Sequence, residues 1–94
     1  MYTLRIGHSV SSFEGWKQAF DNDPVGRQKS RVRRHQVFRA IDDPNYVMID
    51  LEFETAAEAE AMLASLHNLW RHVEGGIMMN PQTRIVEAVE VRDY

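Results

Sequence analysis

Four stretches of the chain alternate apolar and polar residues, which is the pattern of strands with one buried face. They cover residues 2–8, 32–41, 46–53 and 83–92. The third is the clearest, because its odd positions from Val47 to Phe53 are apolar and its even positions include Asp50 and Glu52. The sequence therefore predicts four strands.

Two further stretches repeat apolar residues at the three- and four-residue spacing of a helix. The first follows a capping-box pattern at residues 11–14 and ends before Pro24. The second follows such a pattern at residues 55–58 and ends at Gly75-Gly76. The apolar positions are Phe13, Trp16 and Phe20 in the first helix, and Ala59, Met62, Leu63, Leu66, Leu69, Trp70 and Val73 in the second.

The predicted order of elements is β-α-β-β-α-β, in one domain that spans residues 1–94. Right-handed crossovers place both helices on the same face of a four-stranded antiparallel sheet. We therefore expect an α+β protein with the ferredoxin-like arrangement, whose second sheet face carries no helix. Residues 77–82, between the second helix and the last strand, are expected to form an apolar loop.

The turn Asp42-Asp43-Pro44-Asn45 joins the second and third strands and predicts a hairpin with a four-residue loop. In that register Phe38 lies opposite Ile49 beneath the helices, while Arg39 and His35 lie on the open face. The open face then combines apolar side chains with paired charges, which favours an interface.

The length of 94 residues limits the size of the core. A chain of this length buries only about 60–65% of its unfolded surface. Because the chain has no cysteine, no disulfide adds stability. A partner subunit would bury further surface, so we expect a homodimer that forms through the open sheet face.

Targeting signals and membrane spans are not evident. No apolar stretch approaches the roughly 18 residues of a membrane span, and the N-terminus lacks a basic region followed by an apolar run. We therefore expect a cytoplasmic protein without a membrane partner. The net charge of −3 disfavours nucleic acid as a partner.

The charges are distributed unevenly along the chain. Six of the eleven basic residues lie within residues 27–39, whereas residues 40–70 contain seven carboxylates and no Lys or Arg. Two interpretations are open. The opposite charges either pair across the strands and on the surface, or the basic residues form a rim that attracts an anionic ligand.

The chain resembles the dimeric α+β barrel superfamily over nearly its full length. The resemblance rests on Trp16-Lys17, Phe20-Asp21, Phe38-Arg39, Asp42-Asp43-Pro44-Asn45, and Phe53 followed by an Ala-rich helix. The superfamily includes antibiotic-biosynthesis monooxygenases, small polyketide cyclases and muconolactone isomerases. The resemblance implies that two sheets pack face to face into an eight-stranded barrel, and that ligands bind between the helices and the sheet of each subunit.

The monooxygenase branch of this superfamily typically uses an Asn, a Trp and a His or Tyr to activate a substrate that itself reacts with oxygen. The resemblance points to Asn68, Trp70 and His72 as the residues of this chain that could correspond. Alternate residues on a helix diverge by about 200°, so these three do not share one face.

Two histidines are candidates for proton transfer. His8 ends the first strand at the mouth of the expected pocket, where an imidazole would suit proton abstraction next to a carbonyl. His67 shares a helix face with Arg71, and the two could guard the pocket and hold an acidic substrate. Each also has a structural alternative, His8 as a partly buried core residue and His67 as an exposed one.

Large side chains are expected to form the walls of the pocket, although core packing alone would also account for them. These residues are Trp16, Phe20, Phe38 and Trp70. Met78 in the apolar loop would cap the pocket or pack on the partner. Arg39 or Arg71 would stabilise an anion, unless Arg39 pairs with Asp50.

These observations favour a cofactor-independent monooxygenase, cyclase or isomerase that acts on a small, flat aromatic or polyketide-like compound. The alternative is a non-catalytic dimeric module that binds a ligand or a partner. A helix–sheet cavity with convergent His and Arg side chains would favour the enzyme, whereas a cavity filled by Trp16 and Trp70 would favour the module. Because His67 and His72 diverge on their helix and no HExxH motif is present, we expect no bound metal.

Overall fold

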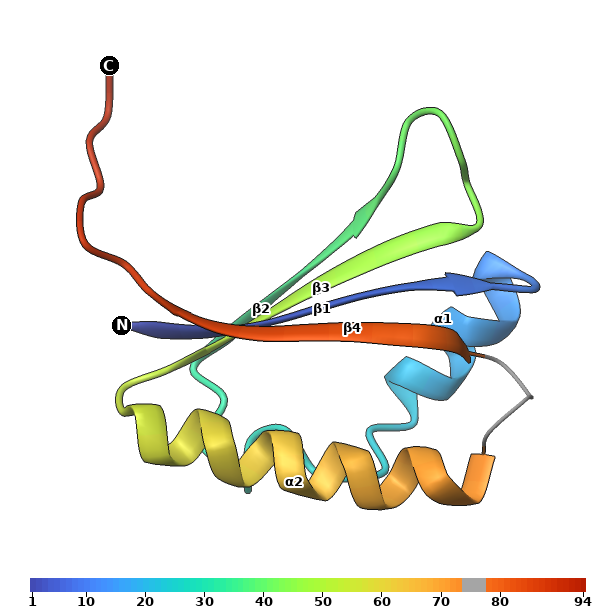
Figure 1. Cartoon of the computed structure of the whole chain (residues 1–94), viewed down its shortest axis with the longest axis horizontal. Helices are drawn as coiled ribbons and strands as arrows, with labels where there is room; N and C mark the ends of the chain where they lie inside the picture. Colours follow the sequence, from blue (N-terminus) through green and yellow to red (C-terminus); the bar gives the residue numbers. More distant parts are fainter. Residues whose placement is uncertain (74–77) are drawn as a thin grey trace.

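A computed structural model describes residues 1–73 and 78–94 of the chain. The elements are β1 (Tyr2–Val10), α1 (Phe13–Asp21), β2 (Arg34–Arg39), β3 (Tyr46–Phe53), α2 (Ala56–Val73) and β4 (Met78–Glu87). The strands form one antiparallel sheet in the order β2-β3-β1-β4. In Figure 1, α2 runs along one face of this sheet with α1 beside it, and the chain after β4 leaves on the opposite side. The protein therefore has the predicted ferredoxin-like α+β fold.

The core lies between the two central strands and α2. The alternation predicted for β3 is confirmed, because Val47, Ile49, Leu51 and Phe53 are all buried. Leu4 and Ile6 of β1 and Ala59, Met62 and Leu66 of α2 complete the cluster, with Trp16 from α1. None of the described helices is long and apolar enough to cross a membrane.

The two helices begin with different caps. At α2 the predicted capping box is confirmed: the Glu58 N–H donates to Thr55 Oγ1 and the Thr55 N–H donates to Glu58 Oε1, both at 3.2 Å. At α1 the predicted cap is wrong by one position. Ser12, whose backbone is extended, accepts the Gly15 N–H at 3.2 Å, so Ser11 lies outside the helix.

The predicted register of the β2–β3 hairpin is also wrong by one position. Phe38 lies opposite Met48, and the connecting loop holds the five residues 41–45 instead of four. A shift of one residue exchanges the two faces of a strand. Phe38 therefore lies on the open face, whereas Arg39 and His35 lie on the face that carries the helices.

The turn geometry accounts for this register. The Ala40 N–H donates to Tyr46 O at 3.0 Å, and the Tyr46 N–H donates to Asp43 O at 3.0 Å. The Asp43 carboxylate also accepts the Asn45 N–H at 3.0 Å. With these bonds Tyr46 pairs with Ala40, so the turn begins one residue earlier than a four-residue loop would, at Ile41 instead of Asp42. As a result Val37, and not Phe38, packs against the core.

The last strand begins and ends earlier than predicted. Residues 78–82 were expected in a loop, but β4 begins at Met78, because the long β1 provides partners for it as far as Val10. At the other end the ladder stops at Glu87 instead of continuing to residue 92. Beyond the ladder, the Ala88 N–H donates to Met1 O at 3.1 Å. The predicted stop at Gly75-Gly76 lies outside the described residues.

The capping box of α2 gives a testable measure of helix stability. We expect Thr55→Ala to lower the free energy of unfolding by about 1 kcal/mol, because the Glu58 N–H loses its acceptor. Urea denaturation followed by circular dichroism measures this change. The matched control Thr55→Ser keeps the hydroxyl and should retain most of the stability, and equal losses in the two variants would contradict the role of the cap.

Candidate functional site

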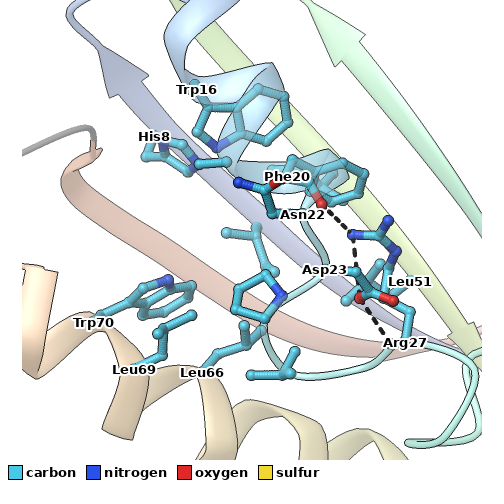
Figure 2. A pocket seen from close by; sticks show the side chains of 15 residues that line it. His8, Trp16, Phe20, Asn22, Asp23, Arg27, Leu51, Leu66, Leu69 and Trp70 are labelled. Carbon is cyan, nitrogen blue, oxygen red and sulfur yellow. Dashed lines mark hydrogen bonds and ion pairs between the residues drawn. The ribbon is translucent and has the colours of Figure 1, made fainter.

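A cavity of about 310 Å³ lies between the helices and the sheet, where the sequence predicted a ligand pocket. Its volume is at the lower end of the range typical of small-molecule sites. The residues that line it come from β1, α1, the segment after α1, β3 and α2 (Figure 2). They are Ile6, His8, Trp16, Ala19, Phe20, Asn22, Asp23, Pro24, Val25, Arg27, Ile49, Leu51, Leu66, Leu69 and Trp70. Eleven of these fifteen are apolar, so the cavity suits an apolar ligand.

Three of the four aromatic residues predicted to form the pocket do line it. Trp16 and Phe20 lie one helical turn apart on α1, and their rings stack with centroids 5.1 Å apart. Trp70 contributes from α2, on the other side of the cavity (Figure 2). The two tryptophans border the space and do not fill it. The cavity therefore has flat aromatic walls.

Among the described residues that line the cavity, His8 is the one histidine. It is 1% exposed, and its ring meets the edge of Trp16 at a centroid distance of 5.8 Å. Its Nδ1 lies 3.3 Å from Ser9 O. Because a carbonyl oxygen can only accept, Nδ1 carries the proton in this contact, and in a neutral ring Nε2 is then the basic nitrogen.

The environment of His8 favours the neutral ring. Burial lowers the pKa of His8 below its ordinary value of 6.5, and the hydrogen bond to the Ser9 carbonyl opposes this only in part. A neutral imidazole can accept a proton from a bound compound, whereas a charged imidazolium cannot. His8 can therefore act as a general base at neutral pH.

The β1–β4 ladder is irregular beside His8. Gly7 pairs with Gln82 but Ser9 pairs with Met79, so Asn80 and Pro81 together stand opposite His8. Asn80 has a φ of 50°, in the left-handed region. Such bulges redirect side chains and are frequent next to active sites. The β1–β4 ladder is thus interrupted at His8, the residue of β1 whose side chain can act as a base.

The polar residues of the segment after α1 were not predicted as site residues. Asn22, Asp23 and Arg27 line the cavity from this segment. Asp23 and Gly26 have φ values of 53° and 68°, which turn the chain back beneath α1. The available signal was the Asp-Pro pair and Gly26 immediately before the first residue of the basic run, which together indicate a tight turn that presents Arg27.

Two residues of β2 predicted to contact the ligand do not reach the cavity. Phe38 is 43% exposed on the open face, because the actual register turns it away from the helices. Arg39 does face the helices, but its guanidinium lies over the Phe13 ring, 4.8 Å from the centroid, and is not among the lining residues. Its expected partner Asp50 instead pairs with Arg5, at 3.2 Å.

The candidates on α2 lie beside the face that borders the cavity. Leu66, Leu69 and Trp70 line the cavity. His67 comes directly after Leu66, and Arg71 directly after Trp70, so each is rotated by about 100° around the helix from a lining residue. Both are exposed. The structure therefore brings neither of these two to the cavity. Of the trio suggested by the resemblance, Asn68 is exposed and Trp70 lines the cavity. His72 and Met78 belong to described elements, but their side chains are outside what the structure describes.

Most of the charge on β2 and β3 is paired, as one of the two interpretations of the sequence held. Arg34 and Glu52 form an ion pair of 2.6 Å, and Arg33 and Glu54 form one of 2.7 Å. His35, expected on the open face, instead contacts the Phe20 ring, with the ring centroids 5.3 Å apart. Within the described part of the chain, no three His, Cys, Asp or Glu residues gather as metal ligands.

The lowered pKa of His8 predicts how stability depends on pH. In the unfolded chain His8 binds a proton near pH 6.5, and in the folded chain it binds one only at lower pH. The free energy of unfolding should therefore fall as the pH drops from 6.5 towards the folded pKa, by about 1.4 kcal/mol for each unit that separates the two pKa values. Urea denaturation between pH 7.5 and 5 measures this change.

Substitution separates the contribution of His8 from the others. His8→Gln should flatten the pH profile, because the group with the lowered pKa is then absent. The pKa of His35 is also lowered, by burial and by the nearby charges of Arg27 and Lys17. The variant His35→Gln therefore measures the part of the pH dependence that comes from His35. A His8→Gln profile as steep as that of the unmodified protein would contradict the prediction.

Comparisons with known proteins bear on the fold. Neither a protein-family model nor a curated protein matches the chain. Among solved structures, a candidate antibiotic biosynthesis monooxygenase from Nitrosomonas europaea has a TM-score of 0.72 and 21% identity, with 96% of this chain and 100% of that chain covered.

Two further structures are similar. SnoaB, a cofactor-independent oxygenase from Streptomyces nogalater, was solved as a mutant and has a TM-score of 0.74 and 12% identity, over 96% of this chain and 94% of that one. A dimeric ferredoxin-like protein from an uncultured marine organism has a TM-score of 0.70 and 13% identity, over 96% and 97%. The chain therefore shares, over nearly its whole length, the ferredoxin-like fold of proteins described as antibiotic biosynthesis monooxygenases and oxygenases.

Proposed function

We propose that the protein is a cofactor-independent enzyme that acts on a small, flat aromatic or polyketide-like compound. One observation carries this proposal: a buried His8, held neutral, lines an apolar cavity with aromatic walls. Apolar side chains on several elements would hold a flat ring system by contact with its faces. The basic nitrogen of His8 would then stand next to an acidic C–H or O–H group of the bound compound.

Removal of that proton is a first step common to the three reaction types suggested by the sequence. The electron pair of the broken bond stays on the compound as an enolate or phenolate, and the proton moves to His8. Return of the proton to a different carbon gives an isomer of the compound, which is the reaction of an isomerase. Attack of the carbanion on a carbonyl of the same molecule closes a ring, and the resulting alkoxide takes the proton back from His8, which is the reaction of a cyclase. Reaction of the carbanion with dioxygen and return of the proton give a hydroperoxide; loss of water then breaks the O–O bond and leaves one oxygen atom on the compound as a carbonyl, which is the reaction of a monooxygenase.

The fold comparison supports the reaction with oxygen, because SnoaB, which has the same fold, is described as a cofactor-independent oxygenase. The aromatic cavity and the buried imidazole support a chemical step. The alternative is a non-catalytic module that binds a flat ligand in the same cavity.

Replacement of His8 tests the catalytic role. Oxygen uptake and absorbance changes would be screened with phenols and aromatic ketones, without added cofactor. We expect His8→Ala to lower the turnover of any substrate found by about 10²- to 10⁴-fold, the usual contribution of a general base. The control Ser65→Ala should keep full turnover, because Ser65 is exposed on α2 and does not line the cavity.

The outcome also separates the enzyme from the module. Binding of the aromatic compounds, followed by tryptophan fluorescence, should survive in His8→Ala, because the apolar walls are intact. Full turnover in His8→Ala would refute the role of His8. Binding by the unmodified protein with no turnover of any compound would favour the module.

We also propose that the protein forms a homodimer through the open face of its sheet. Phe38 and Met48 lie opposite each other on this face, and each is 43% exposed. Beside them Asp50 is buried and paired with Arg5. A patch of large apolar side chains next to a satisfied charge pair is typical of an interface. One similar structure is described as a dimeric ferredoxin-like protein.

Light scattering tests the dimer. We expect a mass of twice 10.9 kDa at micromolar concentration, and a shift of Met48→Asp to the monomer, because the new carboxylate would be buried without a partner. Ala64→Asp, on an exposed position of α2, is the matched control and should remain a dimer. A monomeric unmodified protein would contradict the proposal.

A further inference from the structure

The base and the cation of the cavity lie in separate places. His8 comes from β1 and contacts Trp16. Asn22, Asp23 and Arg27 all come from the segment after α1. Figure 2 shows the Arg27 guanidinium next to Phe20, away from His8. A ligand that spans the cavity would therefore meet a base in one place and a cation in another.

Arg27 is held in position by three contacts. Its guanidinium lies over the Phe20 ring, 3.9 Å from the centroid. Its Nη1 donates to Phe20 O at 2.8 Å, and its backbone N–H donates to the Asp23 carboxylate at 2.8 Å. The side chain is only 18% exposed. An arginine oriented in this way loses little further conformational freedom when it binds a ligand.

Most N–H groups of the Arg27 guanidinium have no hydrogen-bond acceptor among the described residues. A guanidinium has five N–H groups. Among the described residues, one hydrogen bond from these groups is made, to Phe20 O, and the Asp23 carboxylate lies 3.6 Å from Nη1. The planar fork of the remaining N–H groups matches the two oxygens of a carboxylate. In an apolar cavity such charge-assisted bonds are stronger than in water.

We propose that Arg27 binds an ionised carboxylate of the ligand, so that the cavity selects flat aromatic acids over their neutral analogues. This inference rests on the proposed function, because it assigns the substrate class of the same cavity. With the carboxylate on Arg27, the aromatic ring lies among Phe20, Trp16 and Trp70. The position that loses a proton to His8 is then remote from the carboxylate.

Asp23 sets the strength of this selection. Its carboxylate is fixed by the Arg27 backbone N–H and repels a second carboxylate on the same guanidinium. Asn at position 23 would keep an oxygen acceptor for that N–H but would carry no charge. Loss of the Asp23 charge should therefore strengthen acid binding, whereas loss of the Arg27 charge should weaken it. A purely structural role of Arg27 predicts no such opposite effects.

The test compares 2-naphthoate with its neutral amide, 2-naphthamide, by calorimetry and tryptophan fluorescence. We expect the unmodified protein to bind the acid about tenfold more tightly or better, as charge-assisted hydrogen bonds allow. Arg27→Gln should bind the two compounds equally, and Arg27→Lys should keep part of the preference. Asp23→Asn should increase the preference for the acid. Lys29→Gln removes an exposed cation two residues away and should change nothing.

The outcomes separate this inference from the proposed function. If the unmodified protein binds both compounds equally, or if Arg27→Gln weakens both by the same factor, Arg27 does not select the acid and the inference is overturned. If neither compound binds, the cavity is not an aromatic site and the proposed function fails with it. Circular dichroism identifies a variant that is unfolded, and the gain expected in Asp23→Asn does not depend on Arg27→Gln being folded.

Discussion

The structure depends on the burial of one face of the central β1–β3 pair beneath α2. Leu4, Ile6 and the odd residues of β3 are buried on this face, and α2 covers them with Ala59, Met62 and Leu66. Because side chains on a strand alternate, this burial determines which residues of every other strand face the helices. It also determines that the alternate residues of the same strands are presented on a face without helices.

The cavity follows from the same arrangement and from the size of the chain. α2 covers the central strands along its length, whereas α1 has only nine residues, and the segment after it returns beneath α1 through left-handed turns. The side chains between α1, this segment and the second half of α2 do not close the space that they surround. His8 and Arg27 consequently border a common volume although they come from a central strand and a loop.

The electrostatics of the cavity are those of an apolar site with few polar groups. Burial keeps His8 neutral, and the pair of Asp23 and Arg27 carries no net charge. Such a site does not attract ions from a distance, but it binds a ligand more tightly when the groups of the ligand match the positions of the base and the cation. Charged residues in and beside β2 and β3 have a different role, because Arg34 pairs with Glu52 and Arg33 pairs with Glu54 away from the cavity.

The order of elements, the core faces of β1 and β3 and the capping box of α2 could all be predicted from the sequence. These features follow from local patterns, namely alternation, helical spacing and capping residues. The same patterns identified His8, Trp16, Phe20 and Trp70 as candidates, because large or titratable residues on a predicted core face must lie near the space between the layers.

Only the tertiary structure decided the register of β2, the extent of β4 and the role of the segment after α1. The hairpin loop accommodates four or five residues with similar local chemistry, so hydrogen bonds across the turn and the packing of Val37 select the register. The position of Arg27 depends on contacts with Phe20 and Asp23 that form only when the turn closes. The sequence determined which faces are buried, and packing between distant segments decided which side chains share the cavity.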